Sequence, residues 1–319
     1  MRRPKPHIPD DIRHPLADAI DLAIEDNHQK NNKPRGYLGM SAIGKSCARS
    51  LWYGFRFASG KSAVFPARTL RHFEDGHRTE ELAAERINRI PGCQLIELRP
   101  DGEQFACSGV NGHFSGHCDG FLKGVPGEDP EEIFLWENKC SAQPTYNKLK
   151  KLILDKPMSQ VMYDWNPTYY FQIQIYMKKF NEQGMKLKAA LHTVDCAGGR
   201  EETLVIKTPL DDLHADSMDA KAIMIVQAQS PDAFPKVATS PTAYDCTFCD
   251  HKNVCHDPET RMVEHCRTCV NSIPVTNRED MGKAPWYCQR HEKFLSFEEQ
   301  LKGCMSYEPI ELQEQQEAA

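Results

Sequence analysis

A short apolar segment that ends in two charged residues constrains the fold more than any other part of the sequence. The run Ile133–Trp136 is followed at once by Glu137, Asn138 and Lys139. On a strand, side chains two positions apart face the same way, so Glu137 and Lys139 would share one site, while Asn138 faces away and offers its backbone carbonyl. Because buried charges are unfavourable unless they are paired or bind a metal, the segment predicts a core strand that ends at a functional site.

Apolar spacing around this strand predicts a mixed α/β core. Helices are expected over 11–28, from Ser41 through Trp52, and over 77–90, 145–156, 168–181 and 210–228; strands are expected over 93–98, 103–108, 113–122, 132–139, 186–195 and 202–207. This order favours a mixed central sheet flanked by helices. The expected divisions are an N-terminal extension (1–34), this core (35–240), a Cys/His-rich metal-binding lobe (241–306) and an acidic tail (307–319).

A second carboxylate precedes the charged strand end. The stretch Gly116-x-x-Asp119 lies in a predicted strand and presents Asp119 beside small residues. Two carboxylates can hold Mg²⁺ or Mn²⁺, the metal acidifies its bound water, and a lysine can orient that water or stabilise developing charge. Phosphodiester hydrolysis needs this combination. The structural alternative places Asp119 in a turn and makes Glu137 and Lys139 a surface ion pair.

A third element makes the pattern more specific. In the predicted helix over 168–181, Gln172 and Tyr176 are four positions apart and share one face. With the two motifs above, this Gln-x-x-x-Tyr motif resembles the RecB-like branch of the PD-(D/E)XK nucleases, which includes the CRISPR-adaptation exonucleases. The resemblance implies a restriction-endonuclease-like core. It also implies these roles: Asp119, Glu137 and the Asn138 carbonyl as ligands of Mg²⁺ or Mn²⁺, Lys139 as the catalytic lysine, and Gln172 and Tyr176 as residues that place the lysine or the DNA backbone.

The early helix of that family contributes a further metal ligand, which is an acid or a histidine. Glu80 follows Gly76 at the G-x-x-x-E spacing of the lambda-exonuclease-like members, so the resemblance implies Glu80 as the ligand, with His77 as the substitute. The structural alternative for both residues is a solvated turn of an acidic helix.

Thirteen cysteines stand out in a chain that we expect in a reducing compartment, where closely spaced cysteines are more often metal ligands than disulfides. In RecB-like nucleases with an iron–sulfur cluster, three C-terminal cysteines join one distant N-terminal cysteine. By this resemblance, the ligands of a [4Fe–4S] cluster would be Cys47, Cys246, Cys249 and Cys255. The cluster would clamp the two ends of the nuclease domain together.

The clustered ligands that remain suit a zinc ion. The set combines a Cys-x-x-Cys pair with a Cys-x-x-His pair: Cys266, Cys269, Cys288 and His291. A rival zinc ribbon would use Cys246, Cys249, Cys266 and Cys269 and would leave three clustered ligands unused. His251, His256 and His265 lie nearby as possible substitutes. Cys304 and the other isolated cysteines are expected to be small apolar or incidental residues.

The predicted helix after the charged strand is rich in lysine. We expect phosphate contacts and base stacking from Tyr146, Lys148, Lys150 and Lys151. The net charge of −6 argues against coating nucleic acid by bulk charge, but it allows a local basic groove. A solvated basic helix face is the alternative.

These patterns favour a metal-dependent DNA exonuclease that acts on ends or single strands in recombination, repair or phage DNA metabolism. Two alternatives stay open: a catalytically silent DNA-binding module and a metal-cluster scaffold or sensor. No apolar run is long enough for a membrane span or a signal core. We therefore expect a cytoplasmic protein of a bacterial or phage-infected cell, without membrane contact. A homo-oligomer or a recombination partner protein is possible.

Overall fold

The computed structural model of the chain describes residues 12–60, 65–277 and 284–311. A five-stranded mixed sheet lies at its centre, with the strand order β2-β5-β6-β7-β8. β6 pairs in parallel with β7, and the other neighbours pair antiparallel. The strands are β2 (Gln94–Ile96), β5 (Gly120–Lys123), β6 (Ile133–Ser141), β7 (Ala189–Cys196) and β8 (Leu204–Pro209).

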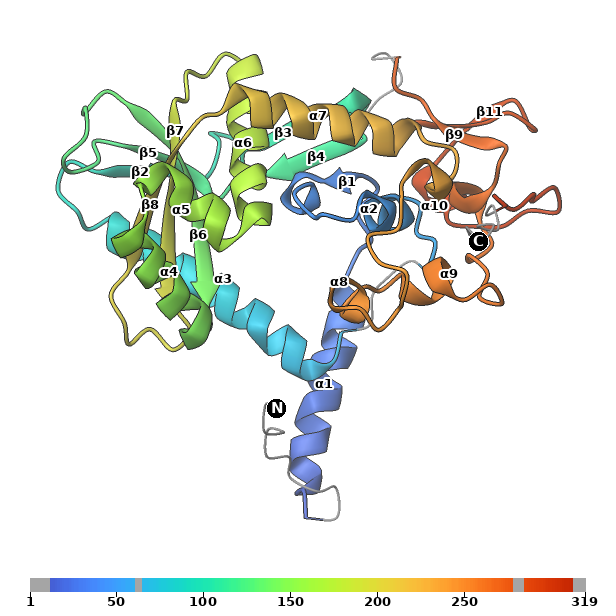
Figure 1. Ribbon diagram of the computed structural model, residues 1–319, viewed down its shortest axis with the longest axis horizontal. Helices are drawn as coiled ribbons and strands as arrows, with labels where there is room; N and C mark the ends of the chain where they lie inside the picture. Colours follow the sequence, from blue (N-terminus) through green and yellow to red (C-terminus); the bar gives the residue numbers. More distant parts are fainter. Residues whose placement is uncertain (1–11, 61–64, 278–283, 312–319) are drawn as a thin grey trace.

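Helices cover both faces of this sheet (Figure 1). On one face, α3 (Ala67–Ile87) packs against β6, where Ala83 and Ala84 join the cluster of Phe134 and Trp136. The other face carries three helices: α4 (Gln143–Asp155), α5 (Met158–Trp165) and α6 (Pro167–Glu182). The prediction of a mixed sheet flanked by helices is confirmed.

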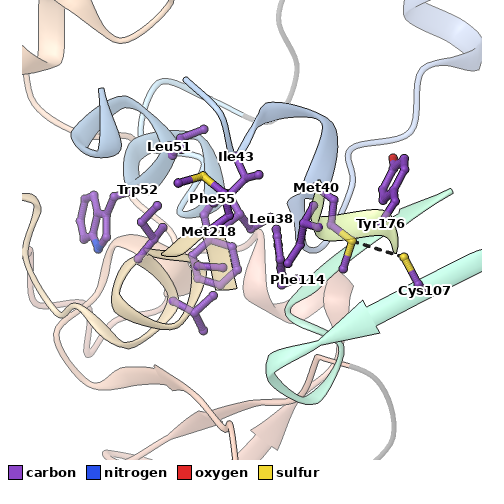
Figure 2. Packing of buried hydrophobic residues seen from close by; sticks show 14 of the residues in the cluster. Leu38, Met40, Ile43, Leu51, Trp52, Phe55, Cys107, Phe114, Tyr176 and Met218 are labelled. Carbon is purple, nitrogen blue, oxygen red and sulfur yellow. Dashed lines mark hydrogen bonds between the residues drawn. The ribbon is translucent and has the colours of Figure 1, made fainter. Parts of the chain in front are cut away.

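A smaller sheet and two helices extend the core sideways. The small sheet has the order β1-β4-β3, from β1 (Leu38–Gly39), β3 (Ala106–Gly109) and β4 (Phe114–His117). α2 (Ala48–Phe55) and α7 (Asp212–Gln227) pack together beside it. Figure 2 shows the buried cluster that they share, which contains Trp52, Phe114 and Met218, and in which Cys107 Sγ lies 3.4 Å from Met40 Sδ.

The C-terminal lobe is a small sheet with short helices. Its elements are α8 (Tyr244–Thr247), α9 (Lys252–His256), β9 (Ser272–Pro274), β10 (Trp286–Cys288), β11 (Lys293–Leu295) and α10 (Phe297–Gln300), with the strand order β11-β10-β9. Trp286, Leu295 and Ile310 belong to the same buried cluster as Phe114. The lobe therefore shares one hydrophobic core with the α/β unit.

Two buried arginines join the lobe to α2. Arg56 and Arg267 are 0% and 1% exposed, and their guanidinium carbons lie 5.0 and 4.7 Å from the ring centroid of Trp286. Arg267 donates to the carbonyls of Phe55 and Gly36, both at 2.7 Å, and Arg56 donates to the Arg267 carbonyl at 3.1 Å. Backbone carbonyls and aromatic faces thus take the place of a carboxylate partner.

Some element boundaries differ from the prediction. The strand expected over 113–122 breaks at Cys118 and Asp119, so β4 joins the small sheet and β5 the main sheet. The helix expected from Ser41 begins only at Ala48, because the Cys47 side chain accepts from Ser50 N and caps α2. α5 was not predicted, because it is only 8 residues long and lies between Pro157 and Asn166.

The two ends of the chain also differ from expectation. α1 (Pro15–Asn31) is helical as predicted, but it projects from the molecule and buries none of its side chains (Figure 1). In the predicted acidic tail, Glu308 O accepts from Val270 N and Ile310 N donates to Thr268 O, so these residues pair with the lobe. Residues 312–319 lie outside the described part. Among the described residues, no helix is both long enough and apolar enough to cross a membrane.

We expect Arg267→Ala to lower the free energy of unfolding by about 3–5 kcal/mol, as for other large buried side chains cut back to alanine. The change removes the hydrogen bonds to Phe55 and Gly36 and leaves a void beside Trp286. Urea denaturation checks the size of the effect, with exposed Arg261→Ala as the matched control. Equal stability of the two variants would contradict the role given to Arg267.

Candidate active site

The charged end of β6 lies where this strand runs past its neighbour β5. The ladder with β5 stops at Gly120 opposite Trp136, whereas β7 continues beside β6 as far as Ser141. Asp119 comes directly before β5, so it stands at the point where β6 loses that neighbour. Its carboxylate accepts a hydrogen bond from Asn138 N at 2.8 Å. The sheet itself therefore brings Asp119 and Glu137 together.

Glu137 is fixed by two donors from different elements. Its Oε2 accepts from Lys139 Nζ at 2.7 Å and from Gln172 Nε2, on α6, at 3.0 Å. The Lys139 ammonium also lies 5.1 Å from the ring centroid of Tyr169, which is on α6 like Gln172. The Glu-x-Lys and Gln-x-x-x-Tyr motifs, which lie far apart in the sequence, meet at one carboxylate.

The other oxygen of Glu137 has no hydrogen-bond partner among the described residues, although Glu137 is only 1% exposed. Burial raises the pKa of Glu137 above its usual range, and the neighbouring carboxylate of Asp119 raises it further, while Lys139 opposes both effects. An unpaired buried carboxylate oxygen is costly. A cation at Oε1 would remove this cost.

α3 brings a third carboxylate to the same place. Burial raises the pKa of Glu80 to about 7, and the carboxylate of Asp119 adds to the rise, while Lys139 lowers it. Glu80 therefore interacts with the residues at the end of β6, as the early-helix ligand of the resemblance would. His77, the substitute, is exposed one turn earlier.

Glu97 is a fourth carboxylate, which the sequence reasoning missed. It follows β2, and a Cβ on Gly120 would lie 3.3 Å from its Cα. Burial and the carboxylate of Asp119 raise the pKa of Glu97. No motif marks this residue; only the pairing of β2 with β5 places it beside Asp119.

The glycine of Gly116-x-x-Asp119 makes room for the tyrosine of the helix motif. A Cβ on Gly116 would lie 2.5 Å from Tyr176 Cε1 and 3.0 Å from Met40 Cβ. Tyr176 is 2% exposed, and burial followed by the charge of Glu137 raises its pKa well above the usual range. Tyr176 thus packs under the site as a neutral phenol.

The expectation that Tyr146 contacts DNA is wrong. The ring is fully buried among the residues under α4, and its hydroxyl donates to Glu202 O at 2.5 Å. No face of the ring is left for a base to stack on. Of the three lysines on the same helix, Lys148 donates to the Asp164 carbonyl, Lys150 pairs with Glu202, and Lys151 is exposed.

Four cysteines gather where α2 meets the start of the lobe. Burial raises the pKa of the Cys249 and Cys255 thiols, and the thiolate of Cys47 raises both further. Cys246 also acts on Cys249, and its Sγ lies 3.5 Å from His256 Nε2. The distant Cys47 is thus close to the C-terminal group, within reach of electrostatic interaction.

A second group of thiols surrounds the turn at Cys266. Burial raises the pKa of Cys266 to about 11, and the thiolates of Cys304, Cys288 and Cys269 add to the rise. Cys304, which the sequence analysis treated as an isolated cysteine, therefore belongs to this second thiol group. In the described part of the chain no three His, Cys, Asp or Glu side chains are yet arranged to hold a metal ion. Metal binding in either thiol group, or between the carboxylates, would require side chains to turn.

No protein-family model and no curated protein matches the sequence. Among solved structures, the crystal structure of SSO0001 is similar at 13% identity, with 77% of this chain and 98% of that one covered and a TM-score of 0.42. An alkaline exonuclease (LHK-Exo) from Laribacter hongkongensis is similar at 12% identity, with 60% and 86% covered and a TM-score of 0.40; its complex with dAMP gives 0.39.

We expect Gly116→Ala to cost about 1–3 kcal/mol of stability, the range for an overpacked core, because the new methyl group meets the Tyr176 ring. Gly76→Ala is the matched control: it lies inside α3 with open space around it, and it should stabilise the protein by about 0.5–1 kcal/mol. Thermal unfolding measures both. If the two substitutions shift the melting temperature in the same direction, the packing argument fails.

Proposed function

We propose that the chain is a divalent-metal-dependent deoxyribonuclease of the PD-(D/E)XK type, which acts on DNA ends or single strands in recombination, repair or phage DNA metabolism. One observation supports this most. Asp119, Glu137 and Lys139 meet at one end of β6, and Gln172 of α6 orients the buried carboxylate. A surface ion pair, the structural alternative, would not have its carboxylate at 1% exposure and bound by a glutamine from a neighbouring helix.

The carboxylates fit Mg²⁺ or Mn²⁺ as hard oxygen ligands. Asp119, Glu137 and Glu80 would hold the ion with the Asn138 carbonyl, and the unpaired Oε1 of Glu137 is an open ligand position. The ion would supply an acidified water and charge compensation at the phosphate. Glu97, next to Gly120, is a fourth carboxylate that interacts with Asp119.

Lys139 has the position of a catalytic lysine. Its ammonium is held between Glu137 Oε2 and the Tyr169 ring, and the two carboxylates keep it protonated by raising its pKa against burial. A fixed positive charge at this place can stabilise the charge that develops on a phosphate oxygen. Gln172 would keep Glu137, and with it the ammonium of Lys139, in position.

DNA would approach over α4. Lys148, Lys150 and Lys151 are exposed there and can contact phosphates. The charge of −6 for the whole chain means that a groove near the site, rather than the whole surface, must attract DNA. Stacking of bases would have to come from residues other than the buried Tyr146.

Both thiol groups are proposed as metal sites that hold the lobe in place. Cys47, Cys246, Cys249 and Cys255 offer the four thiolates of a [4Fe–4S] cluster, and Cys47 interacts with Cys249 and Cys255 although it lies some two hundred positions earlier in the chain. The second group, around Cys266, suits zinc. The cluster would cross-link the start of α2 to the lobe through Cys47, and the zinc ion would hold segments of the lobe together.

We expect Lys139→Ala to reduce cleavage of end-labelled linear DNA in Mn²⁺ by at least about 100-fold, the range for loss of one transition-state donor. Lys186→Ala, an exposed lysine beyond α6, is the control and should cleave like the wild type. Both single- and double-stranded substrates should be followed. Wild-type protein that binds DNA but never cuts it would favour a silent binding module or scaffold instead.

Metal binding can be measured without cleavage. At a Mn²⁺ concentration of about 100 Kd, the wild type should gain about 2.7 kcal/mol of stability. Asp119→Asn should lose most of this gain. Without metal, the same variant should melt at an equal or higher temperature, because a like charge beside Glu80 and Glu137 is removed. Equal stabilisation of both proteins by Mn²⁺ would place the ion elsewhere.

A further inference from the structure

A cavity of about 470 Å³ opens at the edge of the lobe sheet, and thiols line it. Cys266 comes from the turn before β9, Cys288 from the end of β10, and Cys304 from the loop after α10. His291, Lys293 and Lys302 complete the rim. Three segments of the lobe thus meet around sulfur atoms.

The backbone holds these segments in register. Cys269 N donates to Cys266 O at 3.1 Å, which closes a tight turn between the first two cysteines. Cys266 N donates to Lys302 O at 3.2 Å, so the loop that carries Cys304 is tied to the same turn. β10 pairs Cys288 with both Ser272 of β9 and Lys293 of β11. Main-chain contacts therefore place Cys266, Cys288 and Cys304 around the cavity, with Cys269 at the end of the turn that begins at Cys266.

The electrostatics agree with this placement. After burial, the thiolate of Cys304 is the largest cause that raises the pKa of Cys266, ahead of Cys288 and Cys269. The thiolates of Cys266 and Cys288 in turn raise the pKa of Lys293, after its pairing with Glu299. Four cysteine thiolates are a set that a structural zinc ion takes.

We propose that Cys304 completes a four-thiolate zinc site with Cys266, Cys269 and Cys288, and that His291 donates a hydrogen bond to Cys304 instead of binding the metal. His291 Nε2 lies 3.8 Å from Cys304 Sγ, within hydrogen-bond reach of a sulfur acceptor. Metal-bound thiolates and imidazoles are commonly held by such outer partners. Lys293 and Lys302 would offset the net negative charge of four thiolates around one Zn²⁺.

This assignment replaces the Cys₃His set that the Cys-x-x-His spacing predicts. Spacing along the chain could not include Cys304, because that residue has no nearby cysteine and reaches the cavity only through the turn after α10. In the described part of the chain the four thiols are not yet arranged around one point, so zinc binding would require their side chains to turn. The bound ion would fasten the last described segment, which includes Glu308 and Ile310, to the turn at Cys266.

Differential alkylation of the full-length wild type tests the proposal residue by residue. Zinc-loaded protein, purified under reducing conditions, is treated with iodoacetamide before and after chelation, and each cysteine is read by mass spectrometry. Cys304 is exposed, yet we expect it to be protected together with Cys266, Cys269 and Cys288, and to react once zinc is removed. Cys304 that reacts freely while the other three are protected would overturn the assignment, as would a protein that holds no zinc or a disulfide among these residues.

Variants supply the second measurement, zinc affinity by competition with a chelator. Cys304→Ser should weaken zinc binding by more than about 100-fold, and His291→Ala by about 10-fold, as for an outer partner. Cys93→Ser, outside the lobe, is the matched control. A larger loss for His291→Ala than for Cys304→Ser would return the fourth position to the histidine. Neither experiment depends on nuclease activity, so failure of one proposal leaves the other standing.

Discussion

The buried carboxylate of Glu137 is the constraint around which the α/β core is arranged. A charge at 1% exposure is tolerated only with partners, and these come from two elements: Lys139 on the same strand and Gln172 on α6. Gln172 fixes α6 against β6, and Asp119, which accepts from Asn138 N, fixes the start of β5 there. The site therefore also holds α6 and the start of β5 against β6, while Oε1 of Glu137 is left for a ligand.

Small residues allow these elements to approach. Without a side chain at Gly116, the ring of Tyr176 lies against β4, and α6 can bring Gln172 to the end of β6. On the opposite side, the pair Arg56 and Arg267 ties the lobe to α2 through carbonyls and the indole of Trp286. Because the lobe shares a core with α2, thiols of its first segment stand beside Cys47, and a metal there would strengthen a contact that packing already makes.

Periodicity was sufficient to predict the main helices and strands, the mixed sheet and the meeting of Glu137 with Lys139. It could not predict where the chain changes sheets. The pattern over 113–122 predicts one strand. The strand breaks at Cys118 and Asp119 instead, and this break places the Asp119 carboxylate beside the end of β6. Glu97 and Cys304 carry no motif and are brought in by strand pairing and by a loop. Tyr146 shows the opposite error, because an aromatic beside lysines looked like a base contact but fills the core.

The most direct test of the account is the location of a divalent ion in crystals grown or soaked with Mn²⁺, from its anomalous scattering. The account predicts a peak bounded by the carboxylates of Asp119 and Glu137 and by the Asn138 carbonyl, at oxygen distances of about 2.1 Å, as for a hard divalent ion. Glu80 should complete the contacts from α3. A manganese ion bound elsewhere, in a protein that degrades DNA, would contradict the assignment of this site.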